Sequence, residues 1–160
     1  MHPQTSLLFR SRGEFVEAVL TAIASTRKSL VLVDRDFSDW PIATSEGIEV
    51  LRTFLLGSPD AGIRVIVGNP DWLEREAPRF MHLRRQFASA IDYRRMPERL
   101  QVDDGGVIGD RRHAARRAHH DFFRGRLTLY DPGVVEPLAA RFDDLWDESA
   151  PCLPVTTLGL

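Results

Sequence analysis

Hydrophobic residues along the chain follow two spacings, which predict helices and strands in alternation. Apolar residues spaced three or four apart predict four helices. One helix ends near Thr26, one carries Ile48, Leu51, Leu55 and Leu56, one spans residues 73–90, and one begins at Pro132. Short runs of apolar residues predict buried strands at residues 30–34, 63–67, 91–96 and 127–130.

Capping residues support two of these helices. Ser11 and Glu14 have the spacing of a capping box. Asp131 followed by Pro132 is typical of an N-cap and the first helical position. Because strands alternate with helices, we predict an α/β fold, a mixed β-sheet flanked by helices on both faces. We expect one domain over residues 1–149 and an irregular C-terminal tail over residues 150–160.

Composition limits the classes of protein to which the chain can belong. Its 160 residues are 43% hydrophobic and 28% charged, which are ordinary values for one soluble domain. No apolar run approaches the roughly 20 residues that cross a bilayer, and residues 1–4 do not resemble the start of a signal peptide. The single cysteine, Cys152, has no partner for an intrachain disulfide, which fits a reducing compartment. We therefore expect a cytoplasmic protein without a membrane partner.

Residues 97–110 predict two short strands joined by a tight turn. The turn is Asp104-Gly105, because Asp-Gly is a preferred pair in two-residue hairpin turns. Leu100 and Val102 supply apolar positions before the turn, and Gly109 closes the second strand.

This stretch resembles the motif of the phospholipase D superfamily. In that family one strand carries His-x-Lys, four residues follow, and an Asp-Gly turn leads into a strand that ends in Gly-Ser-x-Asn. Alignment of Asp104-Gly105 with that turn places Pro97 at the histidine, Arg99 at the lysine and residues 109–112 at Gly-Ser-x-Asn. Residues 141–146 also resemble the Phe-x-x-Leu-Trp helix that often closes these domains. The resemblance covers roughly residues 11–149 and implies a phospholipase D-like α/β half-domain.

The resemblance implies a binding role rather than the family's reaction. That reaction uses one histidine as nucleophile and another as general acid, whereas Pro97 has no side-chain nitrogen to attack with. Arg99 can hold a phosphate, but a guanidinium stays protonated near neutral pH and so cannot act as a base. We therefore expect a non-catalytic module of a bacterial cytoplasmic protein. Because catalytic members build one site from two halves, we expect a homodimer that meets at the edge next to residues 100–109.

The segment that follows is rich in arginine, which predicts an anion site. Six arginines fall within the sixteen residues 111–126, and guanidinium groups bind phosphate through paired hydrogen bonds. The predicted partner is a phosphate-bearing ligand or a protein, and nucleic acid is less favoured because the net charge is −2. An exposed, solvated loop explains the same run of charges, so this alternative stays open. The predicted ligand-binding residues are Arg99, Asp104, Arg111, Arg112, His113, Arg116 and Arg117.

Histidines in the same segment support an alternative function, a divergent phosphodiesterase or nuclease that uses His113, His119 or His120. Its catalytic site would combine His119 or His120 with Asp121. These side chains are also metal-ligand types, as are Asp34, Asp36 and Asp39 after the first predicted strand. Their spacing matches neither zinc nor calcium signatures, and neighbouring histidines on a helix diverge by about 100°. We therefore predict no metal and no cofactor.

Overall fold

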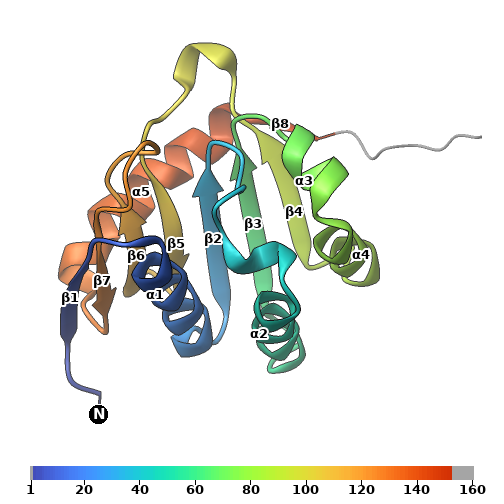
Figure 1. Ribbon diagram of the computed structural model, residues 1–160. Helices are drawn as coiled ribbons and strands as arrows, with labels where there is room; N and C mark the ends of the chain where they lie inside the picture. Colours follow the sequence, from blue (N-terminus) through green and yellow to red (C-terminus); the bar gives the residue numbers. More distant parts are fainter. Residues whose placement is uncertain (1, 153–160) are drawn as a thin grey trace, which may run out of the picture.

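The protein folds around one eight-stranded mixed β-sheet in a computed structural model that describes residues 2–152 (Figure 1). The strands lie in the order β1-β7-β6-β5-β2-β3-β4-β8. Their bounds are β1 Thr5–Phe9, β2 Ser29–Asp34, β3 Gly62–Val67, β4 Ile91–Arg95, β5 Gly105–Gly109, β6 His113–Arg117, β7 Gly125–Leu129 and β8 Ala150–Pro151. The helices are α1 Arg12–Ser25, α2 Ser45–Leu56, α3 Asp71–Glu76, α4 Pro78–Gln86 and α5 Pro132–Glu148, with 3₁₀ segments η1 Pro41–Ala43 and η2 Glu98–Leu100. Within residues 2–152, no helix is both long and apolar enough to cross a membrane.

Strand directions bring several loops to one edge of the sheet. Strands β2, β3 and β4 are parallel, so their carboxyl ends meet at this edge. Strand β5 runs antiparallel to β2 and pairs Gly106 with Val33, so β5 begins where β2 ends. Strand β6 runs antiparallel to β5 and pairs Arg117 with Gly105, so β6 ends there too. Ligands of open α/β sheets bind at the carboxyl ends of parallel strands, which makes this edge the place to look for a site.

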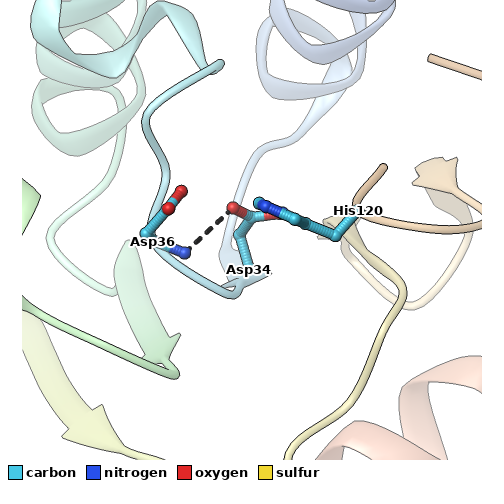
Figure 2. Close-up of side chains that lie close together, drawn as sticks. All are labelled: Asp34, Asp36 and His120. Carbon is cyan, nitrogen blue, oxygen red and sulfur yellow. Dashed lines mark hydrogen bonds between the residues drawn. The ribbon is translucent and has the colours of Figure 1, made fainter. Parts of the chain in front are cut away.

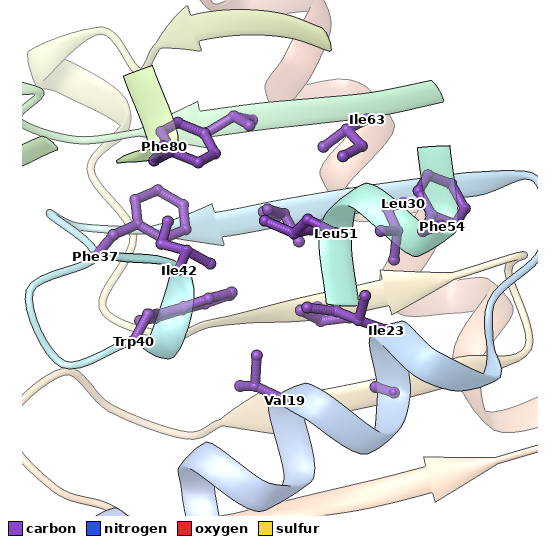
Figure 3. Packing of buried hydrophobic residues seen from close by; sticks show 14 of the residues in the cluster. Val19, Ile23, Leu30, Phe37, Trp40, Ile42, Leu51, Phe54, Ile63 and Phe80 are labelled. Carbon is purple, nitrogen blue, oxygen red and sulfur yellow. The ribbon is translucent and has the colours of Figure 1, made fainter. Parts of the chain in front are cut away.

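Two apolar layers hold the helices against the sheet. The larger layer packs α1, α2 and α4 on one face, where Phe37, Trp40 and Leu51 meet strand residues such as Leu30 and Ile63 (Figure 3). The smaller layer lies on the opposite face and joins α5 to the sheet. Its members include Val33, Ile66 and Ile108 of the sheet and Phe142 and Trp146 of α5.

The α/β class and the main elements agree with the predictions from the sequence. Strands β2, β3, β4 and β7 occupy the predicted apolar runs. Ser11 accepts the N–H of Glu14 at the start of α1, and Asp131 accepts the N–H of Val134 at the start of α5. Local apolar spacing and capping were therefore sufficient to place these elements.

The predicted hairpin over residues 97–110 is wrong. The first predicted strand is absent, because residues 98–100 form the 3₁₀ segment η2, and the actual hairpin joins β5 to β6. Its turn is Asp110-Arg111, whose φ angles of 51° and 56° are typical of a type I′ turn. The carboxylate of Asp110 holds the turn, because it accepts the backbone N–H groups of Arg27, Lys28 and Ser29.

Three further predictions need correction. The helix expected over residues 73–90 is two helices, since Pro78 begins α4 directly after α3 ends. Part of the arginine-rich segment is the strand β6 rather than a loop. Strand β5 is hydrogen-bonded to β2 and β6, so it has no free edge for the expected dimer contact.

Both ends of the chain also contribute strands. Residues 5–9 form the edge strand β1, which the sequence pattern did not indicate. In the tail that was expected to be irregular, Ala150–Pro151 pairs with β4, while residues 153–160 of that tail lie outside the described residues.

Candidate functional site

Two buried aspartates mark the sheet edge where β2 ends and β5 begins. Asp34 is the last residue of β2 and is 3% exposed, whereas Asp104 directly precedes β5 and is 6% exposed. We name the surroundings of the first, Asp34, Asp36 and His120, the Asp34 cluster. We name the second group, Asp104, Arg116 and Arg141, the Asp104 cluster.

The backbone after β2 wraps around the carboxylate of Asp34. Its Oδ2 atom accepts the N–H of Asp36 at 3.2 Å (Figure 2) and the N–H of Phe37 at 2.8 Å. Phe37 has a φ of 65° and a fully buried side chain, so core packing holds a backbone conformation that is rare for a bulky residue. Asp36 in turn accepts the N–H and the hydroxyl of Ser38. The loop that Phe37 anchors in the core thus supplies the two N–H groups that hold the Asp34 carboxylate.

His120 joins this cluster from the loop between β6 and β7. One ligand atom from each of Asp34, Asp36 and His120 lies within 4.8 Å of the other two. The Nδ1 atom of His120 is buried and has no hydrogen-bond partner among the described residues. The backbone N–H of His120 donates to the carbonyl of Asp103 at 2.6 Å, which fixes the loop to the residues before β5.

Arg117 holds the same loop through buried contacts, and its side chain is not accessible to a ligand. Its side chain is 2% exposed, it ion-pairs with Asp39 at 3.2 Å, and it donates to the carbonyls of Phe122 and His120. Its guanidinium also lies 4.4 Å from the ring centroid of Phe123. All these contacts are internal, so Arg117 orders the loop that carries His120.

The two aspartates differ in charge environment. Burial raises the pKa of Asp34, and the hydrogen bonds from Phe37 and Asp36 only partly oppose this effect. Burial would also raise the pKa of Asp104, but hydrogen bonds and charge from Arg141 and Arg116 outweigh it, so the pKa lies below its ordinary value. Arg141 donates to both oxygens of Asp104 at 2.8 and 2.5 Å, and Arg116 donates at 2.9 Å.

The structure separates most of the ligand-binding residues expected from the sequence. Among the seven, a hydrogen bond joins only Asp104 and Arg116. Arg99 pairs with Glu148, and Arg111 pairs with Glu136 and Asp143 of α5. Arg112 is exposed in the β5–β6 turn. His113 is 1% exposed, and its Nδ1 accepts the N–H of Tyr130 at 3.0 Å.

The expected catalytic residues separate as well. His120 faces Asp34, whereas His119 lies 3.8 Å from Asp103 and 3.7 Å from Asp121. The Nδ1 of His119 accepts the backbone N–H of Asp121 at 3.1 Å. His119 and Asp121 therefore form a local, half-exposed group outside the Asp34 cluster.

A groove of about 660 Å³ lies beside α5, on the sheet face formed by β6, β7 and β1. Five arginines line it, Arg10, Arg116, Arg124, Arg126 and Arg141, so we name it the arginine groove. Its remaining lining is mostly apolar and includes Leu8, Val134 and Leu138. Sequence reasoning missed Arg10 and Arg141. Arg141 follows Leu138 by three residues on α5, and this spacing could have placed it on the sheet-facing side.

Comparison with known families identifies the chain. The family described as "Domain of unknown function (DUF7931)" matches residues 11–158. The chain belongs to this family. A comparison of this DUF7931 chain with curated proteins finds no match.

Solved structures similar to this DUF7931 chain include phospholipase D-family members. Nuc of Salmonella typhimurium has a TM-score of 0.68 at 14% identity, covering 95% of this chain and 100% of Nuc. NucT of Helicobacter pylori has a TM-score of 0.57 at 8% identity, covering 94% and 100%. The archaeal chromatin protein TrmBL2 has a TM-score of 0.66 at 13% identity, and 92% of this chain spans 54% of TrmBL2, about half its length. The DUF7931 domain therefore has the phospholipase D-like fold.

Proposed function

We propose that this domain is a non-catalytic phospholipase D-like module that binds a phosphate-bearing ligand with an apolar part. The single observation that carries this proposal is the arginine groove, which is lined by five arginines and by mostly apolar side chains. A guanidinium forms paired hydrogen bonds with phosphate oxygens, and exposed apolar surface favours a hydrocarbon group.

The groove has more positive than negative charge. Arg116 and Arg141 are engaged by Asp104, and Arg126 donates to the hydroxyl of Ser6. Arg10 and Arg124 are exposed, and within residues 2–152 their side chains make no hydrogen bond or ion pair. These two guanidinium groups can therefore bind a phosphate without breaking a hydrogen bond or an ion pair within residues 2–152.

The floor of the groove supports a ligand with a hydrocarbon part. Leu8 of β1 and Val134 of α5 are each 58% exposed. Such side chains stabilise a bound alkyl group by about 25 cal/mol for each Å² removed from water. A free phosphate would leave this surface uncovered, so an amphipathic anion fits the groove better.

The strand that leads into the hairpin turn supports a non-catalytic role. With Asp110 at the turn, the spacing of the family motif places Asp103 at the nucleophilic histidine and Gly105 at the lysine. A Cβ atom on Gly105 would lie 2.6 Å from the carbonyl oxygen of Val33 and 2.7 Å from Oδ1 of Asp34. A lysine side chain at this position would therefore collide with β2, and Asp103 lacks the imidazole that the family's reaction uses as nucleophile. The strand that follows ends at Arg117, and residues 117–120, Arg-Ala-His-His, stand where the family has Gly-Ser-x-Asn.

Titration calorimetry with octyl phosphate below its micelle concentration, at low salt, tests the proposal. We expect binding to the wild type, weaker binding of inorganic phosphate, and none of octyl glucoside, which lacks the charge. The double variant Arg10→Gln/Arg124→Gln should bind octyl phosphate at least tenfold more weakly, because each lost charged hydrogen bond contributes about 1.5–3 kcal/mol. Arg85→Gln, on the exposed side of α4, is the matched control and should bind normally. Equal binding by the double variant, or no binding by the wild type, would contradict the proposal.

One observation favours a second candidate, a divergent phosphodiesterase. His119 is half-exposed and lies near the carboxylates of both Asp103 and Asp121, an arrangement that suits acid–base chemistry. Hydrolysis of bis-p-nitrophenyl phosphate that is lost in His119→Ala and retained in His82→Ala would favour this enzyme. Binding of octyl phosphate without any such turnover would favour the module.

A homodimer stays part of the proposal, because catalytic members of the superfamily combine two halves. Since β5 is internal, such a dimer must use another surface than the edge beside residues 105–109. Light scattering at tens of micromolar protein would test it, and a monomer would contradict it.

A further inference from the structure

We propose that Asp34, Asp36 and His120 bind one divalent transition-metal ion, with Zn²⁺ as the best fit. This site lies at the carboxyl end of β2, apart from the arginines to which the proposed function assigns the phosphate. The inference goes beyond that function and does not depend on it.

The geometry of the cluster allows one ion to touch all three side chains. Ligand atoms from the three residues already lie within 4.8 Å of one another. Ligands about 2.0–2.2 Å from a zinc ion lie roughly 3–4 Å apart, so small rotations of the side chains complete the contact. Asp36 and His120 are only half-buried and have room for such rotations.

A buried nitrogen without a hydrogen-bond partner points to a missing ligand. Asp34 is 3% exposed, and only its Oδ2 atom accepts hydrogen bonds within residues 2–152, so Oδ1 remains without a donor. The Nδ1 atom of His120 is buried and equally without a partner there. Buried polar atoms are nearly always hydrogen-bonded. The side chains of His120 and Asp34 face each other in Figure 2, and one ion that accepts the electron pair of the buried, unpartnered Nδ1 explains why this nitrogen has no donor or acceptor of its own.

The charge balance of the cluster favours a cation. Within residues 2–152, neither Asp34 nor Asp36 forms an ion pair with lysine or arginine. Asp39, which follows in the same loop, has such a partner in the buried Arg117. Two carboxylates therefore share a partly buried space without a compensating positive charge. A bound divalent ion would supply that charge.

The donor set selects the class of metal. One imidazole nitrogen and two carboxylate oxygens suit borderline ions such as Zn²⁺, because calcium and magnesium prefer oxygen alone. Three protein ligands leave a fourth position for water, as in open zinc sites. Half-exposed Asp36 and His120 leave a path by which the ion can enter.

Titration calorimetry of Zn²⁺ into tag-free, metal-stripped protein tests the site. We expect one Zn²⁺ per chain, and an affinity reduced at least tenfold in Asp36→Asn and in His120→Gln. Asp36→Asn keeps the oxygen that accepts the Ser38 N–H, so it should retain the fold, and circular dichroism checks this. The matched control is His119→Gln, which removes the neighbouring imidazole and should leave Zn²⁺ binding unchanged. Arg10→Gln/Arg124→Gln should also bind Zn²⁺ normally, which separates this site from the arginine groove.

Three outcomes would overturn the inference. The wild type could fail to bind Zn²⁺ at millimolar concentration. Folded Asp36→Asn and His120→Gln could both bind as the wild type does, which would place the ion elsewhere. Loss of binding in His119→Gln but not in His120→Gln would assign the ion to the exposed group around His119.

Discussion

Asp34 and Asp104 lie at the same edge of the sheet and are almost equally buried, yet their surroundings shift the pKa of the carboxyl group in opposite directions. Asp104 has three hydrogen bonds from two arginines, and its pKa is lowered. Within residues 2–152, Asp34 has hydrogen bonds only from backbone N–H groups, and burial raises its pKa. Burial by itself therefore does not decide whether the pKa of a carboxyl group in this protein is raised or lowered. Arginines close to the carboxylate decide the direction. Asp34, which has no arginine partner within residues 2–152, is therefore the candidate to bind a metal ion.

The largest expected effect comes from Asp104→Asn. This change leaves two half-exposed arginines around a neutral side chain, and it should lower the free energy of unfolding by about 2–3 kcal/mol at pH 7. A lowered pKa means that the ionised carboxylate stabilises the folded state above the ordinary pKa, and that this stabilisation is lost as the pH falls through the folded-state pKa. The deficit of the variant should therefore shrink between pH 5 and pH 3. Urea unfolding measures it.

Asp103→Asn is the matched control for that prediction. The neighbouring Asp103 side chain is 81% exposed, so its substitution should change stability by less than about 0.5 kcal/mol at either pH. Similar losses for both variants would mean that the arginines around Asp104 contribute nothing specific.

Gly105→Ala tests the close contact between β5 and β2 beside the two aspartates. The new methyl group would meet the backbone carbonyl of Val33, which cannot move without disturbing the strand pair, so we expect a loss of about 2 kcal/mol. Gly13→Ala is the control, because no atom of the described part of the chain lies within 4 Å of a Cβ atom there. Thermal unfolding of both variants measures the difference. Equal stability would show that β5 has room for a side chain at the position of the family's lysine.

The smallest expected effect is a gain from Asp34→Asn, by about 1 kcal/mol at pH 7 in EDTA. A raised pKa means that ionisation of Asp34 opposes folding above the ordinary pKa of aspartate. The gain should therefore grow as the pH rises from about 4, and vanish below it. Urea unfolding at pH 4 and pH 7 tests the sign. With Zn²⁺ in place of EDTA the wild type should become more stable than Asp34→Asn, because only the wild type keeps all three ligands.

The sequence predicted the elements that local patterns specify. Apolar spacing located β2, β3, β4 and β7, and the caps at Ser11 and Asp131 located the starts of α1 and α5. The hairpin was misplaced because Asp104-Gly105 and Asp110-Arg111 both begin with aspartate, and local preference favours the pair with glycine. Contacts from a distant segment decided between them, since Asp110 accepts three N–H groups from residues 27–29.

The candidate sites show the same division. Composition indicated that arginine and histidine in residues 111–126 carry the chemistry. It could not show that Arg117 is buried under aromatic rings, or that Arg111 is already paired with α5. Asp34 and His120 are separated by 86 positions in the chain (120 − 34). A short sequence motif cannot reveal that two residues so far apart in the chain are neighbours in the fold.

The sequence by itself determined the α/β class, the order of most elements and the kinds of side chain available for a site, because these depend on residues close together in the chain. Only the tertiary structure decided which aspartate meets two arginines and which faces a histidine. That choice depends on antiparallel β5 and β6 bringing residues 104 and 120 to the end of β2. Long-range strand pairing, rather than local preference, therefore makes Asp104 the carboxylate that is ion-paired with arginines and leaves Asp34 available to bind a metal ion.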